Sequence, residues 1–169
     1  NHPKSFIPGG KEVKNIVYGE EKFSLIEKLG VDYMFSIEFN EEVQNTEPAD
    51  FVEKFLVGKL KAAEVFCGFN YRFGRKAAGN VDLLRECGKR LGFSVNVIDP
   101  VVVDGEVVSS TLIRSLIKSG EVDECFKYLG RNYDIGGDVV VGNRLGKSLG
   151  FPTSNIMIDE NMVTPPNGV

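Results

Sequence analysis

The chain has no tryptophan, one histidine and three cysteines among its 169 residues. The single imidazole, His2, argues against a histidine-based metal site or a catalytic triad within this sequence. Cys67, Cys87 and Cys125 are odd in number and irregular in spacing, which disfavours both a disulfide framework and a zinc site. We therefore expect a reducing, cytoplasmic setting.

Long apolar runs and a strong excess of one charge are also missing. No stretch approaches the ~18 apolar residues that span a bilayer, and the opening NHPKSFIPGG has no apolar signal-peptide core. The net charge is −4, from 24 acidic and 20 basic residues, so no global attraction to nucleic acid or anionic membrane is expected. We predict small-molecule ligands, with no nucleic-acid and no membrane partner, and any phosphate binding requires a local cluster of residues.

Helical and strand patterns alternate up to about residue 130. This order predicts βαβ units and a parallel sheet. Asp50 and Asn80 are placed to cap two of the helices, and Val81, Leu84 and Cys87 are predicted to face inward. The predicted helices span 19–30, 48–60, 79–92, 110–120 and 121–130, the predicted strands span 31–39, 63–68 and 93–98, and a hairpin with an Asp-Gly turn spans 101–108.

The pattern changes after Gly130. Residues 132–142 and 154–159 are β-like and joined by glycine and proline, as at the start of a β-barrel or sandwich. We place the boundary so that the chain divides into 1–129 and 130–169. The second stretch is too short to hold a core of its own and is predicted to be part of a domain.

The loop GNRLGKSLGFPTSN, residues 142–155, resembles a nucleotide-binding P-loop but departs from it in two ways. Only three residues separate Gly142 from Gly146, where the P-loop needs four. Pro152 then replaces the helix whose amides would meet the phosphates. The P-loop interpretation is therefore rejected.

The chemistry of this loop still suits a nucleotide. Its glycines let backbone N–H groups approach phosphate oxygens. Arg144 and Lys147 add positive charge, and Thr153 and Asn155 offer oxygens suited to hydrated Mg²⁺. The alternative is a β-hairpin that carries surface cations.

The stretch GDVVVGNRLGKSLGFPTSNI, followed by PPNGV, resembles the start of the riboflavin kinase family, which has a Pro-Thr-x-Asn signature. That family folds as a six-stranded β-barrel and transfers the γ-phosphate of ATP to riboflavin. The resemblance implies that Thr153 and Asn155 bind Mg²⁺ and nucleotide phosphates. It also implies that the loop from Gly142 to Gly150 wraps the nucleotide.

Two motifs in the α/β part resemble the bacterial FAD synthetase family, a nucleotidyltransferase. They are CGFNYRFGRKAAGN at 67–80 and VSSTLIRSLIKSGEV at 108–122. A Ser-Ser-Thr run that opens a helix supplies hydroxyls and free amides to an anion, and Arg114 can form two parallel bonds to a phosphate. The alternative interpretation of this second motif is ordinary helix-start chemistry.

The resemblance implies a bifunctional riboflavin kinase/FAD synthetase that makes FMN from riboflavin and ATP, then FAD from FMN and ATP. The implied fold is α/β, a Rossmann-like nucleotidyltransferase domain followed by the start of the kinase barrel. Phe73 and Phe6 would lie along the flavin, Phe73 having the alternative of a core aromatic, and His2 would be structural or near the flavin. The nucleotide-binding residues carried over are Asn70, Ser110, Thr111, Arg114, Gly142, Arg144, Gly146, Lys147, Gly150, Thr153 and Asn155.

Two family motifs are missing from the chain. The synthetase family opens with Gly-x-Phe-Asp-Gly-x-His-x-Gly-His, and the kinase family has a catalytic glutamate beyond the stretch that ends here at Val169. We therefore expect an interior piece of a longer protein, whose catalytic residues lie outside this chain and which alone catalyses neither reaction. The open alternatives are another nucleotidyltransferase of the same superfamily and a non-catalytic flavin- or nucleotide-binding module.

Overall fold

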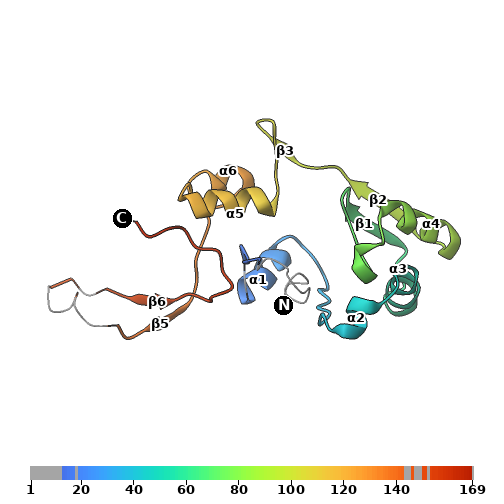
Figure 1. Ribbon diagram of the computed structural model, residues 1–169, viewed down its shortest axis with the longest axis horizontal. Helices are drawn as coiled ribbons and strands as arrows, with labels where there is room; N and C mark the ends of the chain where they lie inside the picture. Colours follow the sequence, from blue (N-terminus) through green and yellow to red (C-terminus); the bar gives the residue numbers. More distant parts are fainter. Residues whose placement is uncertain (1–12, 18, 143–145, 147–149, 152, 169) are drawn as a thin grey trace. The chain divides into compact units, whose positions relative to one another are not determined.

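The computed structural model describes residues 13–17, 19–142, 146, 150–151 and 153–168 (Figure 1). The chain divides into two units, and each is described by itself. The first contains Phe35–Val102 and the second contains Lys11–Met34 and Val103–Val169.

A parallel pair of strands forms the framework of the first unit. Strand β1 (Glu64–Gly68) pairs with β2 (Ser94–Ile98) in a register that runs from Glu64 opposite Ser94 to Gly68 opposite Ile98. Helix α4 (Val81–Leu91) connects them, as expected for parallel neighbours. Asn80 caps this helix by accepting the Leu83 N–H at 2.9 Å, so the predicted cap is confirmed.

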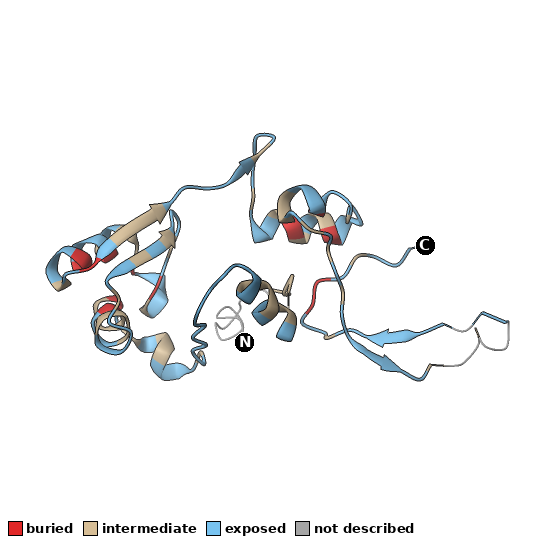
Figure 2. Cartoon of the chain, turned by 180° about the vertical axis from the view of Figure 1, so that it is seen from behind, coloured by how far each residue is buried: buried red, intermediate tan, exposed pale blue. Residues whose placement is uncertain are grey.

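The core of the first unit lies between α4, β2 and the helical segment that precedes β1 (Figure 2). Its buried members are Val52, Phe73, Leu84, Cys87 and Phe93. Leu84 and Cys87 face inward as predicted, while Val81 on the same helix is only half-buried.

The helical segment before β1 differs from its prediction. Helix α2 (Glu41–Asn45) is followed by α3 (Pro48–Phe51), which begins after Glu47 with proline in its first turn, so the predicted cap at Asp50 is wrong. Proline is favoured there because its missing N–H has no partner inside a helix. Asp50 instead pairs with Lys54 at 3.0 Å. The chain continues as a π-helix, η2 (Val52–Lys59), and a short 3₁₀-helix, η3 (Arg75–Ala77), lies beyond β1.

The strand predicted at 31–39 is absent from the described structure, where this stretch is non-helical coil and almost entirely exposed. Its β-branched and aromatic residues have the right propensity, but whether such a stretch becomes a strand also depends on pairing with another strand, which propensity does not encode. Local propensity alone therefore gave the wrong state here.

Among its described residues, the second unit contains the three helices and the antiparallel strand pair named here. The helices are α1 (Glu20–Lys28), α5 (Ser110–Ser119) and α6 (Cys125–Leu129), and the strands are β5 (Asp138–Val140) and β6 (Asn155–Met157). The predicted hairpin is present as β3 (Val102–Val103) and β4 (Glu106–Val107), with Asp104 and Gly105 both at positive φ. The α/β character of the chain is thus confirmed.

The core of the second unit combines residues from distant parts of the sequence. Ile113 and Ile117 of α5 pack with Cys125 of α6 and with Val163, which follows β6. Ile16, from the segment before α1, packs against the same cluster. This core therefore includes residues from both sides of the boundary predicted at 129/130.

Candidate functional site

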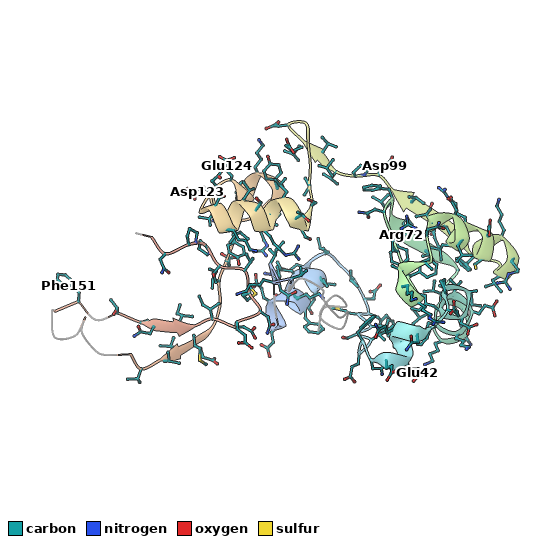
Figure 3. All side chains as sticks on the ribbon, in the orientation of Figure 1. Glu42, Arg72, Asp99, Asp123, Glu124 and Phe151 are labelled. Carbon is teal, nitrogen blue, oxygen red and sulfur yellow. The ribbon has the colours of Figure 1, made fainter. Side chains whose placement is uncertain are left out.

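The antiparallel pairing of β5 and β6 brings together the two ends of the glycine loop. Val140 lies opposite Asn155, so the loop leaves one strand and returns beside its starting point. Phe151 donates its N–H to the Gly146 carbonyl at 2.8 Å, and its side chain projects from the loop with 78% exposure (Figure 3). Arg144 and Lys147, the predicted cations of this loop, lie outside the described residues.

Two of the loop glycines lie directly against the predicted metal-binding side chains. A Cβ atom added to Gly142 would lie 2.7 Å from Cγ and 2.9 Å from Oδ1 of Asn155. A Cβ added to Gly146 would lie 3.0 Å from Oγ1 of Thr153 and closer still to the Phe151 carbonyl. The structure therefore brings Gly142 to Asn155 and Gly146 to Thr153. A side chain at position 146 would meet the Phe151 backbone, whereas one at position 142 would meet only the Asn155 side chain.

The donor set at this loop fits a hydrated magnesium ion. Thr153 and Asn155 are both exposed and present a hydroxyl and an amide oxygen. Mg²⁺ prefers such hard oxygen ligands and retains several waters when it binds with nucleotide phosphates. Gly150 has a φ of 85°, which allows the chain to turn back toward β6.

The start of α5 presents backbone N–H donors and hydroxyl groups. Ser109 caps the helix by accepting the Leu112 N–H at 3.2 Å. The N–H groups of Ser110 and Thr111 have no acceptor among the residues that the structure describes, and both side chains are exposed. The first turn contains no acidic residue, so its positive dipole end is not neutralised locally. These features suit an anionic ligand.

Among the described residues, the guanidinium of Arg114 has one hydrogen-bond partner. Its Nε donates to the Lys14 carbonyl at 2.6 Å, and the side chain is half-buried. A guanidinium has five N–H donors, so this contact leaves both terminal nitrogens available for bidentate binding of a phosphate. Sequence reasoning placed Arg114 at a phosphate but gave no indication of the carbonyl that holds it.

Asn70 and Phe73 belong to the first unit, in the loop that follows β1. Asn70 is exposed, just before Tyr71, whose N–H donates to the Gly68 carbonyl at 3.0 Å. Phe73 is 6% exposed, with its ring centroid 5.3 Å from that of Tyr71 and 5.8 Å from that of Phe51. This burial favours the alternative of a core aromatic for Phe73. Burial also raises the pKa of Tyr71. Phe6 lies outside the described residues.

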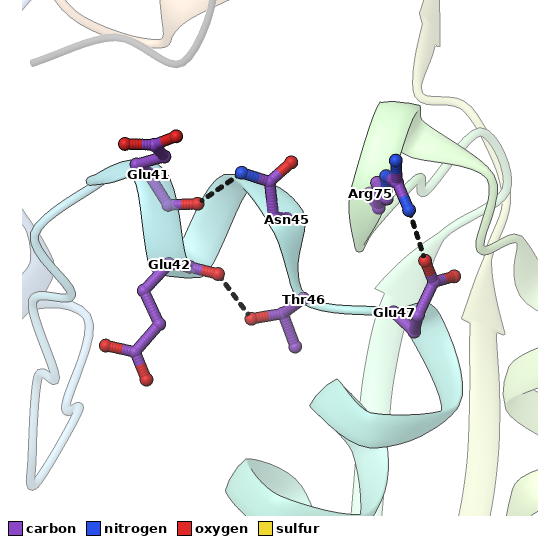
Figure 4. A network of polar contacts seen from close by, with 6 residues as sticks. All are labelled: Glu41, Glu42, Asn45, Thr46, Glu47 and Arg75. Carbon is purple, nitrogen blue, oxygen red and sulfur yellow. Dashed lines mark hydrogen bonds and ion pairs between the residues drawn. The ribbon is translucent and has the colours of Figure 1, made fainter.

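An anchor for this same loop was missed by sequence reasoning (Figure 4). Arg75 donates its backbone N–H to the Thr46 carbonyl at 2.7 Å and forms an ion pair with Glu47 at 3.1 Å. Gly74, with φ at 69°, lies so close to Pro48 that an added Cβ would be 2.7 Å from its Cα. The glycine before Arg75 was the only hint in the sequence that the loop contacts another backbone here.

A separate cleft of about 930 Å³ in the second unit does not coincide with these residues. It lies between the start of α1 and the strands β5 and β6, and no predicted site residue is among the described residues that line it. Its carboxylates would repel phosphate, so we do not assign it to a nucleotide. The acidic residues that line it are Glu20, Glu21, Asp138, Asp159 and Glu160.

The fold and these sites define an α/β unit joined to the beginning of a β-structure that carries a glycine-rich loop. Family models match both parts: FAD synthetase over residues 1–112 and riboflavin kinase over residues 129–169. The chain belongs to the FAD synthetase family. Ser110 and Thr111 lie inside the first match, whereas Arg114 lies between the two.

Curated relatives with the same name match most of the chain. A bifunctional riboflavin kinase/FMN adenylyltransferase of Listeria monocytogenes is 36% identical over 160 residues, which is 94% of this chain and 50% of the relative. Its counterpart in Haemophilus influenzae is 30% identical over 169 residues, 100% of this chain and 54% of the relative. The chain thus spans about half the length of the curated relatives it matches.

A solved structure also resembles the chain. The crystal structure titled macrolide-efflux protein from Streptococcus pneumoniae has a TM-score of 0.80 and 26% sequence identity, and the match covers 99% of this chain and 51% of that one. Within the described residues, the helices are all too short or too polar to cross a bilayer.

Proposed function

We propose that the protein carrying this chain makes FMN from riboflavin and ATP, and then FAD from FMN and ATP. The observation that carries the proposal is the tandem order of the two family matches on one chain. The close packing of Gly142 on Asn155 supports the kinase half. The riboflavin kinase match favours this function over that of another nucleotidyltransferase.

In the kinase step, the γ-phosphoryl group of ATP is transferred to a hydroxyl of riboflavin. Thr153 and Asn155 would hold Mg²⁺, which offsets negative charge on the phosphates when it is bound. Amides of the loop from Gly142 to Gly150 would approach the phosphate oxygens, and Arg144 and Lys147 would add positive charge. These residues bind and orient the nucleotide.

In the adenylylation step, the FMN phosphate attacks the α-phosphorus of ATP and pyrophosphate leaves. The amides and hydroxyls of Ser110 and Thr111 would bind the triphosphate, together with the terminal nitrogens of Arg114. Asn70 would lie near the nucleotide and Phe6 along the flavin. The burial of Phe73 supports a role in fixing the loop that carries Asn70.

The proposed domains are a partial FAD synthetase domain at 1–129, Rossmann-like in its sheet, and the start of a six-stranded kinase barrel at 130–169. The parallel β1–β2 pair and the antiparallel β5–β6 pair support this assignment. The proposed setting is the cytoplasm, with ATP and flavins as the partners.

The experiment separates the two proposed sites. In the complete protein, Asn155→Ala should abolish FMN formation from riboflavin, while FMN adenylylation persists. Product chromatography with riboflavin or FMN as the starting flavin measures each step. Equal loss of both activities, or loss of neither, would contradict the two-site proposal.

A further inference from the structure

The short segment Lys14–Ile16 contacts two parts of the chain that are far apart in sequence. On one side, the Lys14 carbonyl accepts the Nε–H of Arg114 at 2.6 Å. On the other, Asn15 forms a parallel bridge beside Met162: its N–H donates to the Asn161 carbonyl at 2.6 Å, and its carbonyl accepts the Val163 N–H at 2.9 Å. One tripeptide thus contacts both α5 and the stretch that follows β6.

The residues that pair with Asn15 are buried and hydrogen-bonded. Met162 is 4% exposed and Val163 is fully buried. The Tyr133 hydroxyl donates to the Val163 carbonyl, and Ile16 packs against the core that contains Val163. Because these groups are buried and hydrogen-bonded, the bridge holds the segment in a defined position relative to α5.

We propose that Val163, through its hydrogen bond to Asn15, is a positioning residue for the guanidinium of Arg114. The inference rests on the proposed binding of the ATP triphosphate by Arg114. A carbonyl bond to Nε constrains the plane of the guanidinium and uses one of its five N–H donors, so the terminal N–H groups remain for a phosphate. Residues in the riboflavin kinase match would therefore set the ATP affinity of the adenylylation step.

The test removes the bridge without altering Arg114. In the complete protein, Val163→Pro removes the backbone N–H that donates to the Asn15 carbonyl. The matched control, Val163→Ala, keeps that N–H and shortens only the side chain. With FMN and ATP as substrates, we expect Val163→Pro to raise the KM for ATP about fivefold more than Val163→Ala does, the scale of one lost hydrogen bond. The kcat should change less than twofold, because no reacting group is removed.

A double-mutant cycle separates positioning from a general loss of structure. In an Arg114→Ala background, Val163→Pro should have no further effect on the KM for ATP, because the group it positions is gone. If the two effects multiply, the inference is overturned while the proposed role of Arg114 stands. If Arg114→Ala alone leaves the KM unchanged, the proposed function of Arg114 itself fails.

A second variant covers the case in which Val163→Pro does not fold. Tyr133→Phe keeps the ring and removes only the hydroxyl that holds the Val163 carbonyl. A two- to threefold rise in the KM for ATP, absent in the Arg114→Ala background, would support the inference. A folded Tyr133→Phe protein with the wild-type KM would overturn it.

Discussion

Gly142→Ala is a direct test of the geometry at the glycine loop. The new Cβ would lie 2.7 Å from Cγ of Asn155, well inside the distance that carbon atoms tolerate. The atoms it meets all belong to the end of the Asn155 side chain, so the amide group must swing away while the backbone stays in place. The substitution therefore displaces the side chain of Asn155, a proposed magnesium-binding group, without mutating Asn155 itself.

The expected effect on catalysis is large and the effect on folding is small. Moving a positioned group by about 1 Å can lower the rate about 100-fold, which corresponds to about 2.7 kcal/mol of transition-state stabilisation. Gly142 has no left-handed φ and Asn155 is exposed, so alanine should change the free energy of unfolding by less than about 1 kcal/mol. FMN adenylylation should keep its wild-type rate.

Two other glycines of the second unit provide controls. A Cβ on Gly136 would meet nothing within 4 Å, so Gly136→Ala should leave both reactions unchanged. A Cβ on Gly137 would lie 2.9 Å from the carbonyl carbon of Met157 in β6, so Gly137→Ala should instead disrupt the strand pair and lower stability.

The measurements, made on the complete protein, are the kcat for FMN formation, the kcat for FAD formation and a urea unfolding curve for each variant. Wild-type FMN formation by Gly142→Ala would refute the reasoning, because the displaced amide would then have no role. Loss of both reactions with unchanged stability would also contradict it, since the two sites would not be separate.

Two further predictions concern α5 and the first core. Arg114→Ala should raise the KM for ATP in FMN adenylylation about 30-fold, as expected when a charge-assisted contact worth about 2 kcal/mol is lost, and steady-state kinetics would check it. Leu84 is fully buried in α4, so Leu84→Ala should lower the free energy of unfolding, measured in urea, by about 2–5 kcal/mol. A decrease below about 1 kcal/mol would mean that the site is not tightly packed.

The parts of the fold that local chemistry determines could be predicted from the sequence. Asn80 caps α4 as expected, because an Asx side chain can accept a nearby amide without any tertiary contact. The Asp104-Gly105 turn has positive φ at both positions, as this dipeptide favours. The motif residues Gly142 and Asn155 were also identified, although only the structure shows that they touch.

The cap predicted at Asp50 is a local error, because the helix begins two residues earlier at Pro48. The other errors and omissions involve contacts between distant residues. The stretch 31–39 has strand propensity but is coil, because propensity does not determine whether a stretch pairs with another strand. The Lys14 carbonyl meets Arg114 across 100 residues of sequence, and a backbone carbonyl has no sequence signature at all. The ion pair of Glu47 with Arg75 joins two exposed charges whose proximity depends on how the loop after β1 folds.

The shared core of the second unit determines which parts of the chain can unfold independently. Ile16, Ile113 and Val163 are packed together although a boundary predicted from the sequence falls between the last two. A cooperative opening that exposes one of them must expose the others, so α5 and the bridge at Asn15 form a single foldon. Their amides should therefore exchange with solvent deuterium through the same opening. A protein divided at residue 130 would separate the members of that foldon, and neither half would retain its protection.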